Sequence, residues 1–96
     1  MIIIPKKIYD KMVEHAISEL PNEACGILAG KQNIVSEIYT MENIDKSPDS
    51  FFMKPAEQLM VIRDLRRKKI DMISIYHSHP NSPARPSKKD IEMAFY

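Results

Sequence analysis

Residues 70–80, IDMISIYHSHP, form the most strand-like stretch of the chain. β-Branched residues at alternating positions favour an extended strand, in which successive side chains point to opposite faces. His77 and His79 then share a face with Ile73 and Ile75, with the two histidines about 6.5–7 Å apart along the strand. The isoleucines are expected to face the core, and the histidines follow them at the end of the strand. The imidazoles are therefore expected to be half buried, at the point where the strand ends and a loop begins.

Two longer strands, two shorter strands and one helix are predicted upstream. Residues 24–30, ACGILAG, form an apolar run typical of a buried strand, and residues 33–41, NIVSEIYTM, alternate as a strand with mixed faces. Residues 2–4 and 51–53 predict shorter strands. An apolar stripe before Pro21 predicts a helix, and its members are Ile8, Met12, Val13, Ala16, Ile17 and Leu20.

Two more helices are predicted, one before residues 70–80 and one after them. Pro55 suits the first position of a helix that ends near Lys69. Its core-facing residues are predicted to be Leu59, Val61, Ile62 and Leu65. Ser87 is expected to begin a last helix, which would present on one face Ile91, Ala94 and Phe95. This order of elements indicates an α/β or α+β fold with a central mixed β-sheet flanked by helices.

Length, charge and cysteine content narrow the function classes. The 96 residues predict one domain, residues 1–96, with a single modest core. A net charge of +1 gives no general attraction to nucleic acid or to an anionic membrane. The basic run 66–69 falls at a predicted helix end, where cations complement the helix dipole. The lone Cys25 excludes an internal disulfide, and no signal peptide or apolar span is recognisable, so a cytoplasmic protein is expected.

The loop after the strand, residues 80–90, offers a third metal ligand. Neutral imidazoles are good zinc ligands, and a catalytic zinc takes three protein ligands and keeps one position open. Asp90 is the natural candidate, because prolines lower the entropy cost of directing it back toward His77 and His79. Two other interpretations stay open. Ser87-x-x-Asp90 also fits a helix capping box, and the spaced prolines also fit a polyproline docking segment.

A carboxylate upstream is a candidate proton carrier. Hydrolysis at such a site needs a base that carries a proton from the attacking water to the leaving amine. Glu23, within PNEACGILAG at residues 21–30, lies between a helix end and a buried strand. Simple solvent exposure of a Glu at such a junction is the alternative, and sequence spacing does not distinguish the two.

Other enzymes with a His-x-His motif fit less well. An amidohydrolase-type barrel needs on the order of 250 residues. A metallo-β-lactamase-like site would require Asp and His soon after the pair, where Asn81 and Ser82 stand, and a cupin would require another histidine ligand. The remaining histidine, His15, lies on the first predicted helix, where a partly exposed side chain is expected.

The combination of Glu23, HSHP at residues 77–80 and SKKD at residues 87–90 resembles the JAMM-type (MPN-fold) metalloproteases. The family pattern is an upstream Glu, then His-x-His-Pro, a short gap and Ser-x-x-Asp, and all parts appear here in order. The likeness extends from the first predicted helix to the end of the chain. The segment between Met41 and Pro55 is short, and in this it resembles the corresponding segment of the compact prokaryotic members of the family.

The resemblance implies a role for each residue of the motif. His77, His79 and Asp90 would bind Zn²⁺, Glu23 would hold the nucleophilic water and act as general base and then general acid, and Ser87 would stabilise the oxyanion. The implied activity is a zinc-dependent metallopeptidase or isopeptidase. Its substrate would be a peptide or isopeptide bond at the C-terminal tail of a ubiquitin-like or sulfur-carrier (β-grasp) protein, with the tail added as a strand along a sheet edge.

Two other roles are consistent with the same resemblance. One is a non-catalytic MPN scaffold that binds partners without metal, although a scaffold is expected to lack ligands. The other is a DNA-repair-associated relative with a similar motif, which the weakly charged chain disfavours. Ser78 is expected to be structural and Cys25 to be a small buried residue. Because the family domain continues beyond the Ser-x-x-Asp helix, residues 1–96 are expected to be incomplete at the C-terminus, and a homodimer partner could complete the core.

Overall fold

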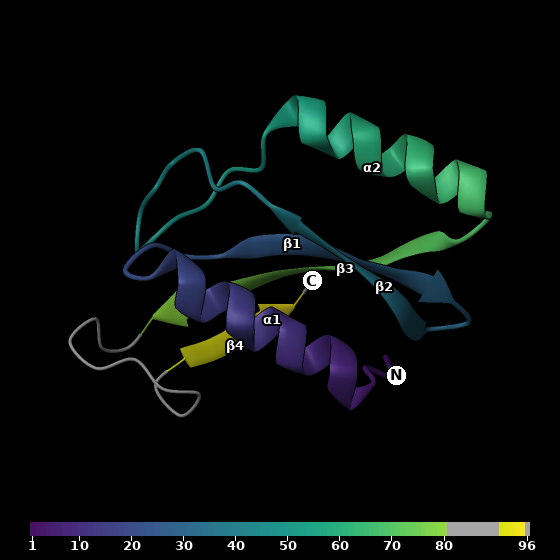
Figure 1. The fold of residues 1–96 in the computed structure, drawn as a ribbon, viewed down its shortest axis with the longest axis horizontal. Coiled ribbons are helices and arrows are strands. Elements are labelled where there is room, and N and C mark those ends of the chain that lie inside the picture. The colour runs from purple at the N-terminus through teal and green to yellow at the C-terminus, as the bar shows by residue number, and fades with distance from the viewer. Residues whose placement is uncertain (81–90, 96) are drawn as a thin grey trace.

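The structure is a computed structural model that describes residues 1–80 and 91–95. Within these residues the chain forms two helices and four strands, and the two helices lie on opposite sides of the sheet (Figure 1). In chain order the elements are α1 (Lys6–Glu19), β1 (Cys25–Lys31), β2 (Ile34–Met41), α2 (Pro55–Lys68), β3 (Asp71–Pro80) and β4 (Ile91–Phe95).

The strands form one sheet in the order β2-β1-β3-β4, and every neighbouring pair is antiparallel. A two-residue turn joins β1 to β2, and Gln32 and Asn33 in it have φ angles of 53° and 65°. Positive φ at both positions is the type I′ turn, whose twist matches that of the flanking strands. Parallel pairing is confined, within residues 1–80 and 91–95, to an isolated bridge between Ile3 and Ile34. The predicted α+β fold class is therefore confirmed.

α1 covers one face of the sheet. The predicted apolar stripe is buried at Ile8, Met12, Val13 and Ala16. It packs against a layer formed by Leu28, Val35 and Tyr76. Ile17 departs from the prediction, since it is 38% exposed, and a cis peptide joins Leu20 to Pro21 just after the helix.

α2 covers the opposite face, and Pro55 is its first residue, as predicted. Val61 and Leu65 are buried against residues of β1 and β2. The prediction that Leu59 and Ile62 face the core is wrong, because these side chains are 49% and 46% exposed. Positions 61 and 65 lie one above the other on a helix, whereas 59 and 62 follow a separate stripe that points away from the sheet.

Three terminal or connecting segments differ from the sequence-based expectation. Residues 2–4 and 51–53 each contribute an isolated bridge instead of a strand, at Ile3 and Met53. The predicted last helix is wrong for Ile91–Phe95, which pairs with β3 as a strand. Ile, Met and Phe alternate within IEMAF, and this segment supplies ladder partners for an edge of β3 that would otherwise be left unpaired. Residues 87–90 lie outside the described residues.

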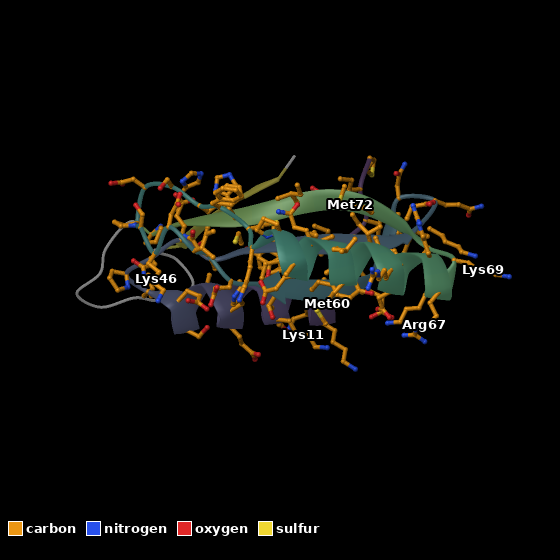
Figure 2. The ribbon with its side chains drawn as sticks, turned by 90° about the horizontal axis from the view of Figure 1, so that it is seen from above. Lys11, Lys46, Met60, Arg67, Lys69 and Met72 are labelled. Carbon is orange, nitrogen blue, oxygen red and sulfur yellow. The ribbon has the colours of Figure 1, made fainter. Side chains whose placement is uncertain are left out.

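The basic run, residues 66–69, lies at the C-terminal end of α2. The loop that links β2 to α2 lies at the opposite end of the molecule. Arg66, Arg67 and Lys68 occupy the last turn, and Lys69 caps it with a φ angle of 58°. Figure 2 shows Lys69 at one end of the molecule and Lys46, from the β2–α2 loop, at the other. Neither α1 nor α2, the helices within the described residues, has the length and apolar character needed to cross a membrane.

Candidate active site

The antiparallel sheet brings two distant parts of the chain to one end. Cys25 at the start of β1 pairs with His77 near the end of β3. Glu23 lies two residues before Cys25, in the connection that follows α1. The predicted carboxylate and the predicted histidine pair, more than fifty positions apart in sequence, therefore meet at the same edge of the fold.

Glu23, His77 and His79 form one compact cluster. Oε1 of Glu23 lies 2.8 Å from Nδ1 of His77 and 4.0 Å from Nδ1 of His79. The two imidazole rings meet edge to face, with centroids 4.5 Å apart and planes inclined by 76°. One ligand-capable atom from each residue lies within 4.8 Å of the others. This geometry places three potential metal-binding groups around one point.

The cluster is closed at Glu23 and open at His79. Glu23 is 1% exposed and His77 is 8% exposed, whereas the His79 side chain is 48% exposed. The buried pair is held together by the hydrogen bond of 2.8 Å between Nδ1 of His77 and Oε1 of Glu23. The arrangement therefore presents a sheltered carboxylate and a sheltered imidazole beside a second imidazole, that of His79, which solvent can reach.

Phe51 covers one imidazole of the cluster. Its ring stacks on His77 with centroids 4.7 Å apart and planes 26° apart. The ring comes from the β2–α2 connection, residues 42–54, so it reaches the site from a third part of the chain. Sequence reasoning treated residues 51–53 as a short strand and missed this contact. The sequence feature that could have indicated this contact is the aromatic pair Phe51-Phe52 at the end of a largely polar loop.

The same connection holds the backbone of Glu23. The Glu23 N–H donates to the Ser47 carbonyl at 2.8 Å, and the Asn43 side-chain amide donates to the Glu23 carbonyl at 3.0 Å. Neither contact was predicted, because nothing in the spacing of Asn43 and Ser47 distinguishes them from ordinary loop residues. Both main-chain groups of Glu23 are thus fixed by the loop that also carries Phe51.

The other predicted site residues fall in different places. Asp90 and Ser87 lie outside the described residues. Ser78 is fully buried, and its hydroxyl accepts a hydrogen bond from the Ala24 N–H at 2.8 Å, in keeping with a structural role. Cys25 is fully buried, and burial, reinforced by nearby carboxylates, raises the pKa of its thiol to about 12. A thiol in that state does not act as a nucleophile near neutral pH.

His15 lies on the other face of the sheet and takes no part in the cluster. The residue is partly exposed, as expected of a helix histidine, although its side chain is only 9% exposed. Its Nδ1 lies 2.8 Å from the Tyr76 hydroxyl, which provides a polar partner beneath α1. Burial lowers the pKa of His15, and Glu19 opposes this effect only partly.

The donor set suits zinc. Two imidazole nitrogens together with carboxylate oxygens are typical zinc ligands, and the exposure of His79 leaves an approach from solvent. Within the described part of the chain, every buried side-chain nitrogen or oxygen has a hydrogen-bond partner. The carboxylate is therefore held in a defined position beside the imidazoles, as a site that binds a cation requires.

Comparison with known proteins points to one family. Residues 5–96 match the family described as prokaryotic homologs of the JAB domain. The chain is 30% identical over 95 residues to a probable TtuB-protein conjugate cleaving protease of Thermus thermophilus, covering 98% of this chain and 64% of that protein. It is 34% identical over 91 residues to a desampylase of Pyrococcus furiosus, covering 95% and 64%.

Two further relatives agree with this picture. The chain is 33% identical over 96 residues to a CysO-cysteine peptidase of Mycobacterium tuberculosis, covering 98% of this chain and 66% of that protein. The solution structure of DSY2949 from Desulfitobacterium hafniense superposes with a TM-score of 0.77 at 44% identity, covering 94% and 64%. The present chain thus spans 64–66% of the length of these four proteins.

Proposed function

Because this chain belongs to the prokaryotic homologs of the JAB domain, we propose that it is a zinc-dependent peptidase or isopeptidase. Its substrate would be the C-terminal tail of a ubiquitin-like or sulfur-carrier protein. The observation that carries the proposal is the convergence of Glu23, His77 and His79 at one end of the sheet. Relatives named for cleaving TtuB-protein conjugates and for CysO-cysteine peptidase activity support the substrate class.

Each residue of the cluster has a separate task in this proposal. His77 and His79 would hold the metal together with Asp90, and Ser87 would donate a hydrogen bond to the oxyanion of the tetrahedral intermediate. When bound, zinc supplies a Lewis acid and lowers the pKa of water to about 7. Glu23 would receive the proton of the attacking water at its carboxylate and deliver it to the leaving amine.

The surroundings of Glu23 fit a proton carrier. The Glu23 side chain is 2% exposed, so bulk water does not compete for its hydrogen bonds. The Phe51 ring excludes water from one side of His77, which strengthens the electrostatic interactions in the cluster. The exposed side of His79 would admit the substrate.

An extended tail has an edge along which to bind. β2 is an outer strand of the sheet, and a groove of about 520 Å³ lies between it and α2, lined by Tyr39, Met41 and Met60 among others. Met41 pairs with Cys25, which in turn pairs with His77, so one row of the sheet connects the groove with the cluster. A tail added beside β2 would make main-chain hydrogen bonds that guide it toward the site.

The test uses a β-grasp carrier whose C-terminal Gly-Gly tail is joined to a reporter through a peptide or isopeptide bond. The zinc-loaded chain should release the reporter, as measured by mass spectrometry. A chelator should abolish release, and Glu23→Gln should lower kcat by about 10²-fold to 10⁴-fold. His15→Gln is the matched control and should retain activity. Unchanged release by Glu23→Gln would contradict the proposed mechanism.

A non-catalytic scaffold makes the opposite prediction. It would purify without stoichiometric zinc and would bind a carrier without releasing the reporter, so elemental analysis separates the two roles. The single domain over residues 1–96, the homodimer and the cytoplasmic location stay predictions. Light scattering of the purified chain tests the second, and fractionation of cells tests the third.

A further inference from the structure

Asn43 is the most fully bonded side chain of the β2–α2 connection. It is a buried polar residue, 5% exposed, two positions after the end of β2. Its amide nitrogen donates to the carbonyls of Glu23 and Ser50, both at 3.0 Å. Its amide oxygen accepts from the N–H groups of Asp45 and Phe52, both at 3.1 Å. The side chain thereby uses two donors and two acceptor positions, which is its full hydrogen-bonding capacity.

The identity of these partners fixes how the amide is oriented. Two carbonyls can only accept and two N–H groups can only donate, so the nitrogen must face Glu23 and Ser50, and the oxygen must face Asp45 and Phe52. No other uncharged side chain of similar size offers two donors on one side and two acceptor positions on the other. The arrangement therefore requires asparagine specifically.

Asn43 connects the two groups that border His77. On one side it bonds the main chain of Glu23, whose carboxylate lies 2.8 Å from His77. On the other side it bonds Ser50 and Phe52, the residues directly before and after Phe51, whose ring stacks on His77. A single side chain thus sets the position of both the carboxylate and the aromatic cover.

We propose that Asn43 is a positioning residue that holds the Glu23 carboxylate and the Phe51 ring against His77. The four hydrogen bonds of Asn43 all go to main-chain groups, so it acts through the main chain of Glu23 and through the loop around Phe51. The kinetic consequence of this inference rests on the proposed function. The structural consequence does not, because the environment of His77 can be measured without substrate.

Two substitutions separate the donor half of the amide from the acceptor half. Asn43→Asp has nearly the same shape and can still accept from Asp45 and Phe52. It replaces the donor with an oxygen that faces the carbonyls of Glu23 and Ser50, so those two bonds are lost. Asn43→Ala removes all four bonds. Val35→Ala is the control, because Val35 is 1% exposed in the apolar layer on the other face of the sheet.

The first measurement follows the ring protons of His77 by NMR, with labelled histidine, at one fixed pH and in the presence of a chelator. A stacked phenyl ring shifts these protons upfield, and Phe51→Leu defines the value without the ring. Asn43→Ala should move His77 most of the way to the Phe51→Leu value, and Asn43→Asp should move it partway. Val35→Ala should leave it unchanged. With only three histidines in the chain, the signals are readily assigned.

The second measurement is zinc affinity by competition with a chromophoric chelator, followed by kinetics on the carrier conjugate. Residues that orient ligands typically change metal affinity or activity by about 10-fold to 100-fold. Both Asn43 variants should lose about 10-fold in zinc affinity, with a fall in kcat larger than any change in KM. Val35→Ala should keep wild-type affinity and kcat while unfolding at lower urea concentration.

The outcomes separate this inference from the proposed function. Wild-type His77 shifts and zinc affinity in either folded Asn43 variant would overturn the positioning role. If Asn43→Ala does not fold, Asn43→Asp decides, because its shape matches that of asparagine. If the wild-type chain releases no reporter, the proposed function fails while the NMR and zinc measurements still decide the role of Asn43.

Discussion

Ala24 and Ser78 are joined by two hydrogen bonds across the start of β1 and the end of β3. The Ser78 N–H donates to the Ala24 carbonyl at 3.0 Å, and the Ala24 N–H donates to the Ser78 hydroxyl at 2.8 Å. Ala24 follows Glu23 directly, and Ser78 stands between His77 and His79. This double contact therefore sets how far the carboxylate lies from both imidazoles.

Ser78→Ala should loosen this connection. The substitution leaves the buried Ala24 N–H without its partner, which costs about 1–3 kcal/mol of the free energy of unfolding. It should also reduce zinc affinity, because Glu23 is no longer held beside His77. Urea unfolding and chelator competition measure the two effects. Ser18→Ala is the control, since that exposed hydroxyl donates to the His15 carbonyl of its own helix at 2.7 Å, and it should stay within about 0.5 kcal/mol of wild type.

Zinc binding should depend on two of the three histidines. His77→Ala and His79→Ala should each purify with much less than one zinc per chain, because each removes an imidazole of the cluster. His15→Gln should retain full zinc, since His15 bonds Tyr76 on the other face of the sheet. Elemental analysis after dialysis gives the stoichiometry. A full equivalent of zinc in the His77 variant would show that the metal lies elsewhere.

The sequence was sufficient to predict which strand and which connection carry the cluster. Alternation along β3 brought His77 and His79 together, as their ring contact shows, and the apolar run after Glu23 correctly predicted the buried strand β1. The prediction that Ile73 and Ile75 share one face is wrong: Ile73 packs on the α1 side and Ile75 on the α2 side, because the register of β1 and β3 shifts between them. The contacts of Phe51 and Asn43 could not be predicted, because they depend on how a polar loop folds back over the sheet. Loop paths of this kind leave no periodic pattern in the chain.

Cys25 should be unreactive in the folded protein. With a thiol pKa of about 12, the thiolate fraction at pH 8 is on the order of 10⁻⁴, and the side chain is fully buried. A disulfide-exchange reagent should modify Cys25 slowly in buffer and rapidly in urea. Cys25→Ala should keep activity within about two-fold, since the thiol takes no part in catalysis. Rapid modification in buffer that stops hydrolysis would argue for a thiol mechanism.

Gly26→Ala should destabilise the protein. A Cβ at position 26 would lie 2.2 Å from the Tyr76 ring, so the fully buried tyrosine would have to move. Overpacking typically costs about 1–3 kcal/mol, which exceeds the roughly 0.4–1 kcal/mol gained by restricting the unfolded chain. Urea unfolding measures the net effect. In a Tyr76→Leu background the same substitution should cost less, and equal costs in both backgrounds would exclude the steric explanation.

His15 should make stability depend on pH. Burial beside Tyr76 lowers its pKa below the unfolded value of 6.5, while Glu19 opposes the shift. Between the two pKa values the unfolded chain binds more protons, so the free energy of unfolding should fall as pH decreases below about 6.5. His15→Gln should remove this part of the pH dependence. The measurement is urea unfolding of the wild type and of His15→Gln, in the presence of a chelator, from pH 8 to pH 5. If the free energy of unfolding has the same pH dependence in both proteins, the predicted role of His15 is refuted.

The type and orientation of an element could be predicted where its apolar residues form a single stripe. They could not be predicted where the apolar residues fit two stripes, or both a helix and a strand. On α2, Leu59 and Ile62 form a second helical stripe, so periodicity alone could not tell which stripe faces the sheet. In Ile91–Phe95, apolar residues fit both a helix and a strand, and pairing with β3 decides between them. Both outcomes depend on tertiary contacts that local sequence does not record.

The tight β1–β2 turn at Gln32 and Asn33 has a practical consequence for experiments. β1 runs from Cys25, in the row of His77, to Lys31 beside that turn, a span of roughly 20 Å at the usual rise per residue. A dye or a surface tether attached at Gln32 would therefore report on the molecule, or immobilise it, without obstructing the end where Glu23 and the histidines meet.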